Sequence, residues 1–429
     1  MKQCPYDPKH QIREDHYWHH VNHCDKRPEM HPSFGLPFYQ ESCAIMNSQL
    51  HSDAQQQSSV SQLTLDQLPV VFEQINVLYS KFVSKYSSIV QLFYQPTQQL
   101  DCEISLEANV STTDRHAKQI KSLVQHIINR DLLNYQKYSA LDQLNQDNNF
   151  LLLEAGSGTG ELSAFLANAV QFKSENTFKV LESQNRAIKQ QRNSNNLIQV
   201  PSNNLIFALV ERETGYKIKY DYLIRQSGAA AFRIVCDLRD LKIENLINWP
   251  SQKLFENYQQ LFNGKIQIQN EEKEPQKETI PLQKFKQVQN NYQSPVVSII
   301  GKHLCGGATD CVLNYATNIR IESFVIALCC HCKSDGHSYI NQRLFKDLGV
   351  SREMLELIHR TTTWQFAFKG QQCNALQEQK KETGFKARVI LDVGRVLWLQ
   401  ENGYDVDVVK YCEETESDEC WALIAQKTK

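Results

Sequence analysis

The chain has 429 residues, 41% of them hydrophobic, and a formal net charge of −2. It is long enough for one large or two ordinary domains, and the near-neutral charge excludes a polycation, although a local basic face stays open. No run of about 18 apolar residues is present and the start lacks an apolar signal core, so we expect neither a membrane span nor export. The 13 cysteines are an odd count, which favours reduced thiols and metal ligands in the cytosol or nucleus.

The N-terminus carries the spacing of a zinc site. Cys4, His10, His20 and Cys24 read C-x5-H-x9-H-x3-C. Thiolate and imidazole ligands close a tetrahedral Zn²⁺ shell, and such a site folds a segment too short to fold by burial of apolar surface. A helix would place His20 and Cys24 on one face. His19 can replace His20 in this set, and the alternative is a histidine-rich tail without metal.

We expect the finger and its trailing segment to span residues 1–45. A Gln/Ser-rich linker follows at 46–64, and a helical lead-in at 65–145. Within the lead-in, apolar residues recur at steps of three or four from Leu68 to Phe93 before Pro96 ends the pattern, which predicts a packing helix.

A second helical stretch is predicted from about His116 to Leu144. We assign the rest of the chain, residues 146–429, to one α/β domain. Inside it, residues 251–293 are rich in Gln, Asn, Lys and Glu, which is typical of a solvated insertion with little fixed structure.

Short apolar strands alternate with helices in this domain. The segments are NFLLLEAGSGTGELS, TFKVLESQNRAIKQQ, AFRIVCDLRDL, PVVSIIGKHLCGGATD and SFVIALCCHC. Such alternation predicts a mostly parallel sheet with helices on both faces. The last segment, DVDVVKYCEETESDECWALIAQK, instead predicts an antiparallel hairpin around an acidic loop at 413–419. That hairpin favours the methyltransferase version of a Rossmann-like fold.

A glycine-rich turn follows the first predicted strand, where the backbone can approach a ligand closely. The acid before it, Glu154, suits a cationic amino-acid moiety. Glu182 is predicted to end the second strand and to accept hydrogen bonds from ribose hydroxyls, and Asp237 to end the third and accept from an adenine amino group. These features fit S-adenosylmethionine better than NAD, which prefers G-x-G-x-x-G. The cofactor candidates are Glu154, Gly156, Gly158, Gly160, Glu182 and Asp237.

Two later strands end in segments rich in cysteine and histidine, GKHLCGGATD at Gly301–Asp310 and ALCCHC at Ala327–Cys332. Ligands bind beyond the carboxyl ends of parallel strands. We therefore expect a convergence there of Lys302, His303, Cys305, His331 and Cys332. The cysteines have three possible roles: they bind a second zinc ion, they act as nucleophiles, or they are small residues that shape the pocket. Adjacent cysteines are too crowded to coordinate one ion by themselves.

These motifs resemble the tRNA 2′-O-methyltransferase family that modifies nucleotide 4 in the acceptor stem, with its CHHC zinc finger. The resemblance is carried by CPYDPKH, GKHLCGGATD, IALCCHC and KARVILDVGRVLWLQENGY, and it covers nearly the whole chain in the same order. The chain departs from the family at Thr159, where lysine is usual, and after His331, and it does not contain the CCCH finger that usually precedes the CHHC finger.

The resemblance implies a Rossmann-like methyltransferase fold with a small N-terminal zinc finger, and S-adenosylmethionine-dependent transfer to a ribose 2′-OH of tRNA. It assigns zinc to Cys4, His10, His20 and Cys24 and the cofactor turn to the three glycines. It also places residues 301–306 and 329–331 at the reaction site.

The transfer is an in-line displacement at a sulfonium methyl, so the enzyme must align a ribose oxygen and ease the loss of its proton. We expect His331 or His303 to accept that proton and Lys302 to stabilise the developing oxyanion.

Acceptor-stem RNA is A-form and is recognised by shape and phosphates. Lys386, Arg388 and Arg395 are candidate phosphate contacts, with a solvated helix face as the alternative. Competing functions are methylation of another RNA or a protein, an RNA-binding protein with an inactive methyltransferase domain, and a structural adaptor. Oligomeric state does not follow from the sequence.

Overall fold

The computed structural model describes residues 2–3, 10–17, 20, 67–100, 114–132, 150–170, 205–213, 220–227, 229–247, 295–302, 304–334, 336, 338–367, 372–417 and 419–428. Several sequence predictions lie outside these residues: Cys4, His19, Cys24, the linker at 46–64, Glu182, the insertion at 251–293 and His303. Among the described helices, none combines the length and apolarity that crossing a bilayer requires.

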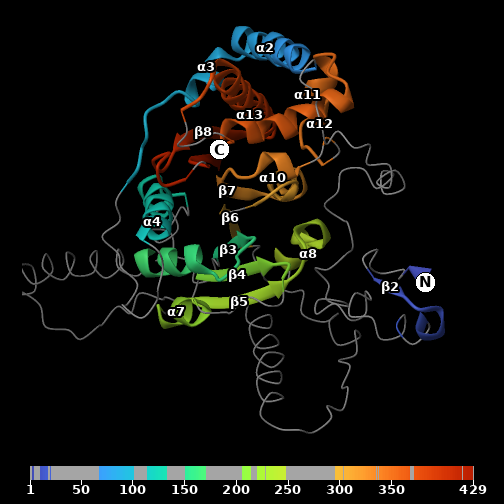
Figure 1. The fold of residues 1–429 in the computed structure, drawn as a ribbon. Helices are drawn as coiled ribbons and strands as arrows, with labels where there is room; N and C mark the ends of the chain where they lie inside the picture. Colours follow the sequence, from blue (N-terminus) through green and yellow to red (C-terminus); the bar gives the residue numbers. More distant parts are fainter. Residues whose placement is uncertain are drawn as a thin grey trace, which may run out of the picture.

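One seven-stranded sheet organises the chain, in the order β5-β4-β3-β6-β7-β9-β8 (Figure 1). The strands are β3 (Phe150–Ala155), β4 (Leu205–Glu211), β5 (Ala230–Val235), β6 (Val296–Lys302), β7 (Ile321–Ala327), β8 (Tyr404–Lys410) and β9 (Trp421–Lys427). All neighbours pair in parallel except β9, which is antiparallel to both β7 and β8. This confirms the predicted mostly parallel sheet that ends in an antiparallel hairpin.

The second strand of the sheet differs from the prediction. Strand β4 pairs with one edge of β3 and β6 pairs with the other, so both edges of β3 are occupied. Residues 205–211 therefore take the place beside β3 that the sequence analysis gave to the strand ending at Glu182, whose own residues lie outside the described part of the chain. The sequence LIFALVE is itself a continuous apolar run, which is typical of a parallel strand covered on both faces.

Helices cover the sheet and fill the lead-in. They are α2 (Leu68–Lys85), α3 (Ser87–Leu92), α4 (Asp114–Asn129), α7 (Asp221–Gln226), α8 (Ile243–Ile247), α10 (Ala308–Asn318), α11 (Gln342–Asp347), α12 (Arg352–Thr361) and α13 (Ala375–Glu401), with short 3₁₀ turns η5 (Leu238–Asp240) and η7 (His331–Lys333). The predicted packing helix is real but is broken at Tyr86, whose φ of −131° and ψ of 39° are not helical. Its buried residues share one hydrophobic core with the sheet.

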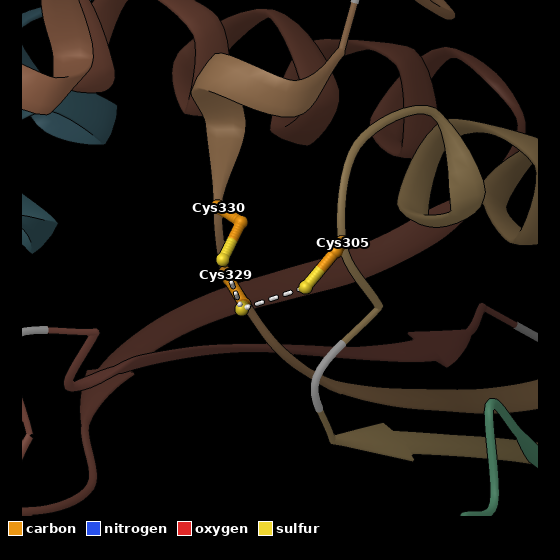
Figure 2. A group of neighbouring side chains, drawn as sticks. All are labelled: Cys305, Cys329 and Cys330. Carbon is orange, nitrogen blue, oxygen red and sulfur yellow. Dashed lines mark hydrogen bonds between the residues drawn. The ribbon is translucent and has the colours of Figure 1, made fainter.

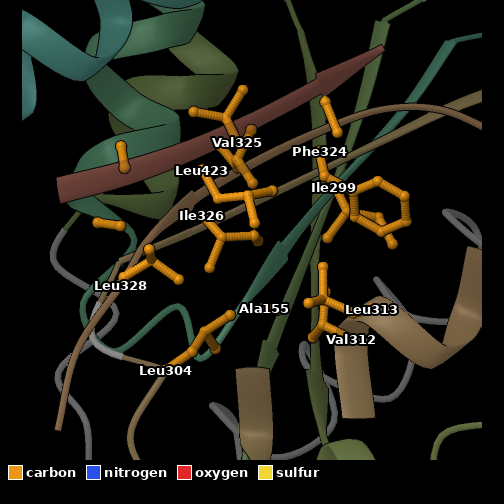
Figure 3. Packing of buried hydrophobic residues seen from close by; sticks show 14 of the residues in the cluster. Ala155, Ile299, Leu304, Val312, Leu313, Phe324, Val325, Ile326, Leu328 and Leu423 are labelled. Atoms are coloured by element: carbon orange, nitrogen blue, oxygen red, sulfur yellow. The ribbon is translucent and has the colours of Figure 1, made fainter. Parts of the chain in front are cut away.

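This core continues up to the carboxyl end of the strands. Ile299 of β6 lies opposite Phe324 of β7, Leu423 of β9 lies opposite Ile326 of β7, and Leu304 lies beside Ala155 at the end of β3 (Figure 3). A Cβ placed on Gly301 would come within 2.6 Å of the Leu304 side chain. Leu304 thus closes the apolar core directly beneath the loops that follow β3 and β6, and polar groups begin beyond it.

Candidate functional site

The turn after β3 requires glycine at its three predicted positions. Gly156, Gly158 and Gly160 have φ values of +61°, +49° and +85°, in the left-handed region that other residues rarely adopt. A Cβ on Gly160 would also lie 3.1 Å from a carboxylate oxygen of Asp221 and 3.2 Å from Arg233. The chain therefore bends sharply at the carboxyl end of the central strand, where parallel sheets bind ligands.

A buried arginine that the sequence reasoning missed holds this turn in place. Arg233 of β5 donates to both carboxylate oxygens of Asp221, at 3.1 and 2.7 Å, and its Nη1 donates to the Gly158 carbonyl at 2.7 Å and to Ser157 Oγ at 3.1 Å. A bidentate, buried arginine–carboxylate pair is a rigid support. No motif pointed to Arg233, because its position depends on strand pairing between distant segments.

Glu154 lies under the turn and is only 3% exposed. Its carboxylate accepts a hydrogen bond from the backbone N–H of Ser163 at 3.2 Å. Burial raises the pKa of Glu154 to about 7, although the hydrogen bonds from Ser163 oppose this rise. A cationic group bound next to Glu154 would favour its charged form, so the residue suits the ammonium end of an amino-acid ligand.

The acid at the tip of the second strand is Glu211. Its Oε2 accepts from the Gly158 N–H at 2.8 Å and its Oε1 from the Glu213 N–H at 3.0 Å. Glu211 therefore occupies the position that the sequence analysis gave to Glu182, next to the glycine turn. The same physical reasoning could have found it, because Glu211 directly follows the apolar run LIFALV.

Asp237 follows β5, as predicted, and caps η5. Arg239 donates to both of its carboxylate oxygens, at 3.0 and 2.9 Å. Burial alone would raise the pKa of Asp237, but the hydrogen bonds from Arg239 lower it below its ordinary value. An adenine amino group would thus meet a charged carboxylate that already holds a guanidinium.

Lys302 ends β6 beside the turn, because its neighbour Gly301 is the register partner of Ala155. Its Nζ lies 2.7 Å from Nε2 of His116 on α4, and Nδ1 of His116 lies 3.1 Å from Oε2 of Glu161. Burial lowers the pKa of Lys302 to about 8. Lys302 was a sequence candidate, whereas His116 and Glu161 were not, since α4 is remote in sequence and carries no recognisable motif.

The predicted role of His331 does not fit its position. Its side chain is 1% exposed, and its Nε2 lies 2.7 Å from Oδ1 of Asp392 on α13. Asp392 also accepts from Arg395 at 2.9 Å, and Arg395 pairs with Asp310 at 2.7 Å. His331 therefore belongs to a buried ion-pair network that joins the end of β7 to α13. A substrate hydroxyl cannot reach it without opening the core.

The predicted phosphate contacts are also wrong for two of three residues. Arg388 and Arg395 are each 1% exposed. Arg388 is ion-paired with Glu419 and lies over the ring of Trp421, and Arg395 belongs to the network just described. Lys386 bonds Glu382 at 2.6 Å and Asn76 at 2.8 Å. Neither a phosphate contact nor a solvated helix face fits the two arginines, because their part of α13 is buried.

Three thiols meet where β6 and β7 end (Figure 2). Sγ of Cys305 lies 3.5 Å from that of Cys329, which lies 3.1 Å from that of Cys330. Zinc–sulfur bonds of about 2.3 Å would hold two sulfurs about 3.8 Å apart, so the adjacent pair is too close to span two corners of a zinc tetrahedron. The hydrogen bond from Cys329 lowers the pKa of Cys305 to about 6. The described cysteines form no disulfide.

Two of the four predicted zinc ligands are described. The rings of His10 and His20 lie edge to face, with centroids 5.1 Å apart. His10 directly precedes β2 (Gln11–Ile12), which pairs antiparallel with β1 (Lys2–Gln3), and His20 follows β2 in the chain. Imidazoles brought this close suit a shared metal ion.

Comparison with known proteins gives a consistent result. A family model described as "Methyltransferase TRM13" matches residues 277–426. The tRNA:m(4)X modification enzyme TRM13 of Schizosaccharomyces pombe is 24% identical, across 99% of this chain and 95% of that protein. The enzyme of the same name from Vanderwaltozyma polyspora is 23% identical across 99% and 89%, and the human homolog 20% across 96% and 83%. The chain is thus similar to TRM13 enzymes over nearly its whole length, and to the TRM13 methyltransferase family model over its C-terminal part.

Proposed function

We propose that the protein methylates the ribose 2′-OH of nucleotide 4 in the acceptor stem of tRNA, with S-adenosylmethionine as donor. The observation that carries this proposal is the juxtaposition at one end of the sheet of a left-handed glycine turn, strand-tip acids and the buried amine of Lys302. Relatives that match nearly the full chain bear the name tRNA:m(4)X modification enzyme, which supplies the substrate class.

The residues present fit the donor. The ammonium and sulfonium charges suit Glu154, and the backbone of the glycine turn permits close approach. Glu211 suits the ribose hydroxyls in place of Glu182, and Asp237 suits the adenine amino group. When bound, the donor supplies an electrophilic methyl group. A dinucleotide does not fit this site, because its negatively charged pyrophosphate would face these acids.

The N-terminal segment completes the proposal. Cys4, His10, His20 and Cys24 would hold one Zn²⁺, supported by the adjacent rings of the two histidines. The finger would then help to hold tRNA, as the resemblance implies. We further propose that the protein acts in the cytosol or nucleus, where its cysteines stay reduced.

The decisive experiment incubates purified protein with unmodified tRNA and S-adenosylmethionine labelled in its methyl group, and maps the labelled nucleotide by mass spectrometry. One 2′-O-methyl group at nucleotide 4 is expected. The matched control is Gly156→Val, whose Cβ would lie 2.9 Å from Leu304 and block the turn. Label on a base, on another position or on protein would overturn the assignment.

A second function, RNA binding by a protein with an inactive methyltransferase domain, makes a different prediction. It requires that titration calorimetry detect no binding of S-adenosylhomocysteine to a protein that still binds tRNA. The intact glycine turn and its support by Arg233 argue for binding.

A further inference from the structure

We propose that Lys302 is the general base that takes the proton of the ribose 2′-hydroxyl, and that His116 with Glu161 orients its amine and carries the proton out to solvent. This inference rests on the proposed function and deepens it. It replaces His331, which the fold buries in an ion-pair network, with a chain of three side chains, of which the sequence suggested only Lys302.

The three groups come from three separate elements that meet at the mouth of the glycine turn. Lys302 is the last residue of β6, His116 lies in the first turn of α4, and Glu161 begins the helical residues 161–170 that follow the turn. The contacts of 2.7 Å from Nζ to Nε2 and 3.1 Å from Nδ1 to Oε2 form one continuous chain. Such a chain exists only in the folded protein, across 186 positions of sequence.

The donor and acceptor roles of the three side chains follow from hydrogen-bond chemistry. A lysine amine donates, so Nε2 of His116 accepts, and Nδ1 therefore carries the ring proton and donates it to the Glu161 carboxylate. The hydrogen bond from Lys302 to His116 restricts rotation of the amine about its Cε–Nζ bond, which limits the directions in which its lone pair can meet a hydroxyl. His116 is thus a positioning residue, and Glu161 fixes its tautomer.

The electrostatic surroundings keep the amine able to act as a base. Lys302 is 6% exposed, and burial is what lowers its pKa to about 8, so a substantial neutral fraction exists near neutral pH. The groups that face it and act against this effect are Glu161, Cys412, Cys329 and Glu154. His116 of α4 also faces the amine, with its Nε2 2.7 Å from Nζ.

The reaction balances as follows. The hydroxyl O–H bond breaks and its proton goes to Nζ of Lys302. The oxygen forms the new bond to the methyl carbon while the carbon–sulfur bond breaks, and that electron pair stays on sulfur, which becomes a neutral thioether. The lysine ammonium then passes its proton to Nε2 of His116, whose side chain is 39% exposed and can release it to water.

The test measures kcat and KM for tRNA against pH for the parent protein and for His116→Ala, His116→Gln and Glu161→Gln. For the parent, kcat should rise with pH to a plateau with a midpoint near 8. His116→Ala should lower kcat about 10- to 100-fold with unchanged KM, and His116→Gln should recover part of this, because its amide oxygen can accept from Lys302. Glu161→Gln should move the midpoint down, since the carboxylate that raises the pKa of Lys302 is lost.

The matched control is Lys118→Ala, an exposed residue two positions along the same helix, which should behave as the parent. Binding of S-adenosylhomocysteine to each variant, measured by calorimetry, verifies that the fold and cofactor site persist. The inference is overturned if His116→Ala keeps full kcat, or if His116→Gln is no better than His116→Ala and Glu161→Gln leaves the midpoint in place. If the parent protein itself transfers no methyl to tRNA, the proposed function fails instead.

Discussion

Two charged clusters lie close to the predicted reaction site, and they differ in access to solvent. Lys302, His116 and Glu161 open to solvent through His116. His331, Asp392, Arg395 and Asp310 are sealed, with side chains between 0% and 2% exposed. Both clusters contain histidine, a carboxylate and a cation, so residue type does not distinguish them. Burial does, because a closed ion network can stabilise a fold but cannot exchange protons with a substrate.

The largest effect should come from breaking the sealed cluster. Arg395→Ala removes the cation that pairs with buried Asp310 and one of the partners of buried Asp392, which should cost about 3–5 kcal/mol of unfolding free energy. Urea unfolding followed by circular dichroism measures this loss. Lys386→Ala on the same helix is the control and should change stability by less than about 1 kcal/mol. Equal stability of the two variants would contradict the structural role.

Substitutions in the solvent-accessible cluster of Lys302, His116 and Glu161 should change the reaction rate and not the stability of the fold. Lys302→Met should lower kcat by about 10²–10⁴, the range typical of a lost general base, while the unfolding free energy stays close to that of the parent. The comparison partner is His331→Asn, which should lose stability, and activity only to the extent that folded protein is lost. A folded His331→Asn protein without activity, beside an active Lys302→Met protein, would reverse the two roles.

A third, smaller effect concerns pH and cofactor binding. Burial raises the pKa of Glu154 to about 7, so the folded protein holds this proton up to a higher pH than the unfolded chain does, and ionisation between about pH 4.3 and 7 reduces stability. A cationic ligand prefers the ionised form. Affinity for S-adenosylhomocysteine should therefore rise about tenfold from pH 6 to pH 8. Calorimetry on Glu154→Gln should show a flat profile, and a fall in affinity with pH in the parent would refute this.

The smallest effect should come from the thiols. If Cys305, Cys329 and Cys330 only shape the pocket, Cys329→Ser should change activity less than tenfold and leave the zinc content unchanged. Atomic absorption should find one zinc per chain in the parent and in Cys329→Ser, and none in Cys4→Ser. Loss of zinc from Cys329→Ser would place a metal at the thiols.

The sequence by itself determined the order of strands and turns near the site, because apolar runs and left-handed glycines are local requirements. β3, β5, β6, β7 and the terminal hairpin all appear where their patterns predicted them. It did not anticipate β4, although LIFALV is more uniformly apolar than the predicted segment TFKVLE. Pairing of β4 with β3 puts Glu211 at the turn, and this pairing joins segments that are distant in the sequence.

Tertiary structure alone decided which charged side chains can do chemistry. His331 follows β7 and Lys302 ends β6, both in motifs rich in cysteine and histidine, yet α13 closes over His331, and α4 gives Lys302 an accessible partner in His116. Burial and long-range contacts set pKa and access, and both depend on elements brought together from distant parts of the chain. The residue type fixes which reactions a side chain can perform, whereas tertiary packing fixes its exposure, its partners and its pKa.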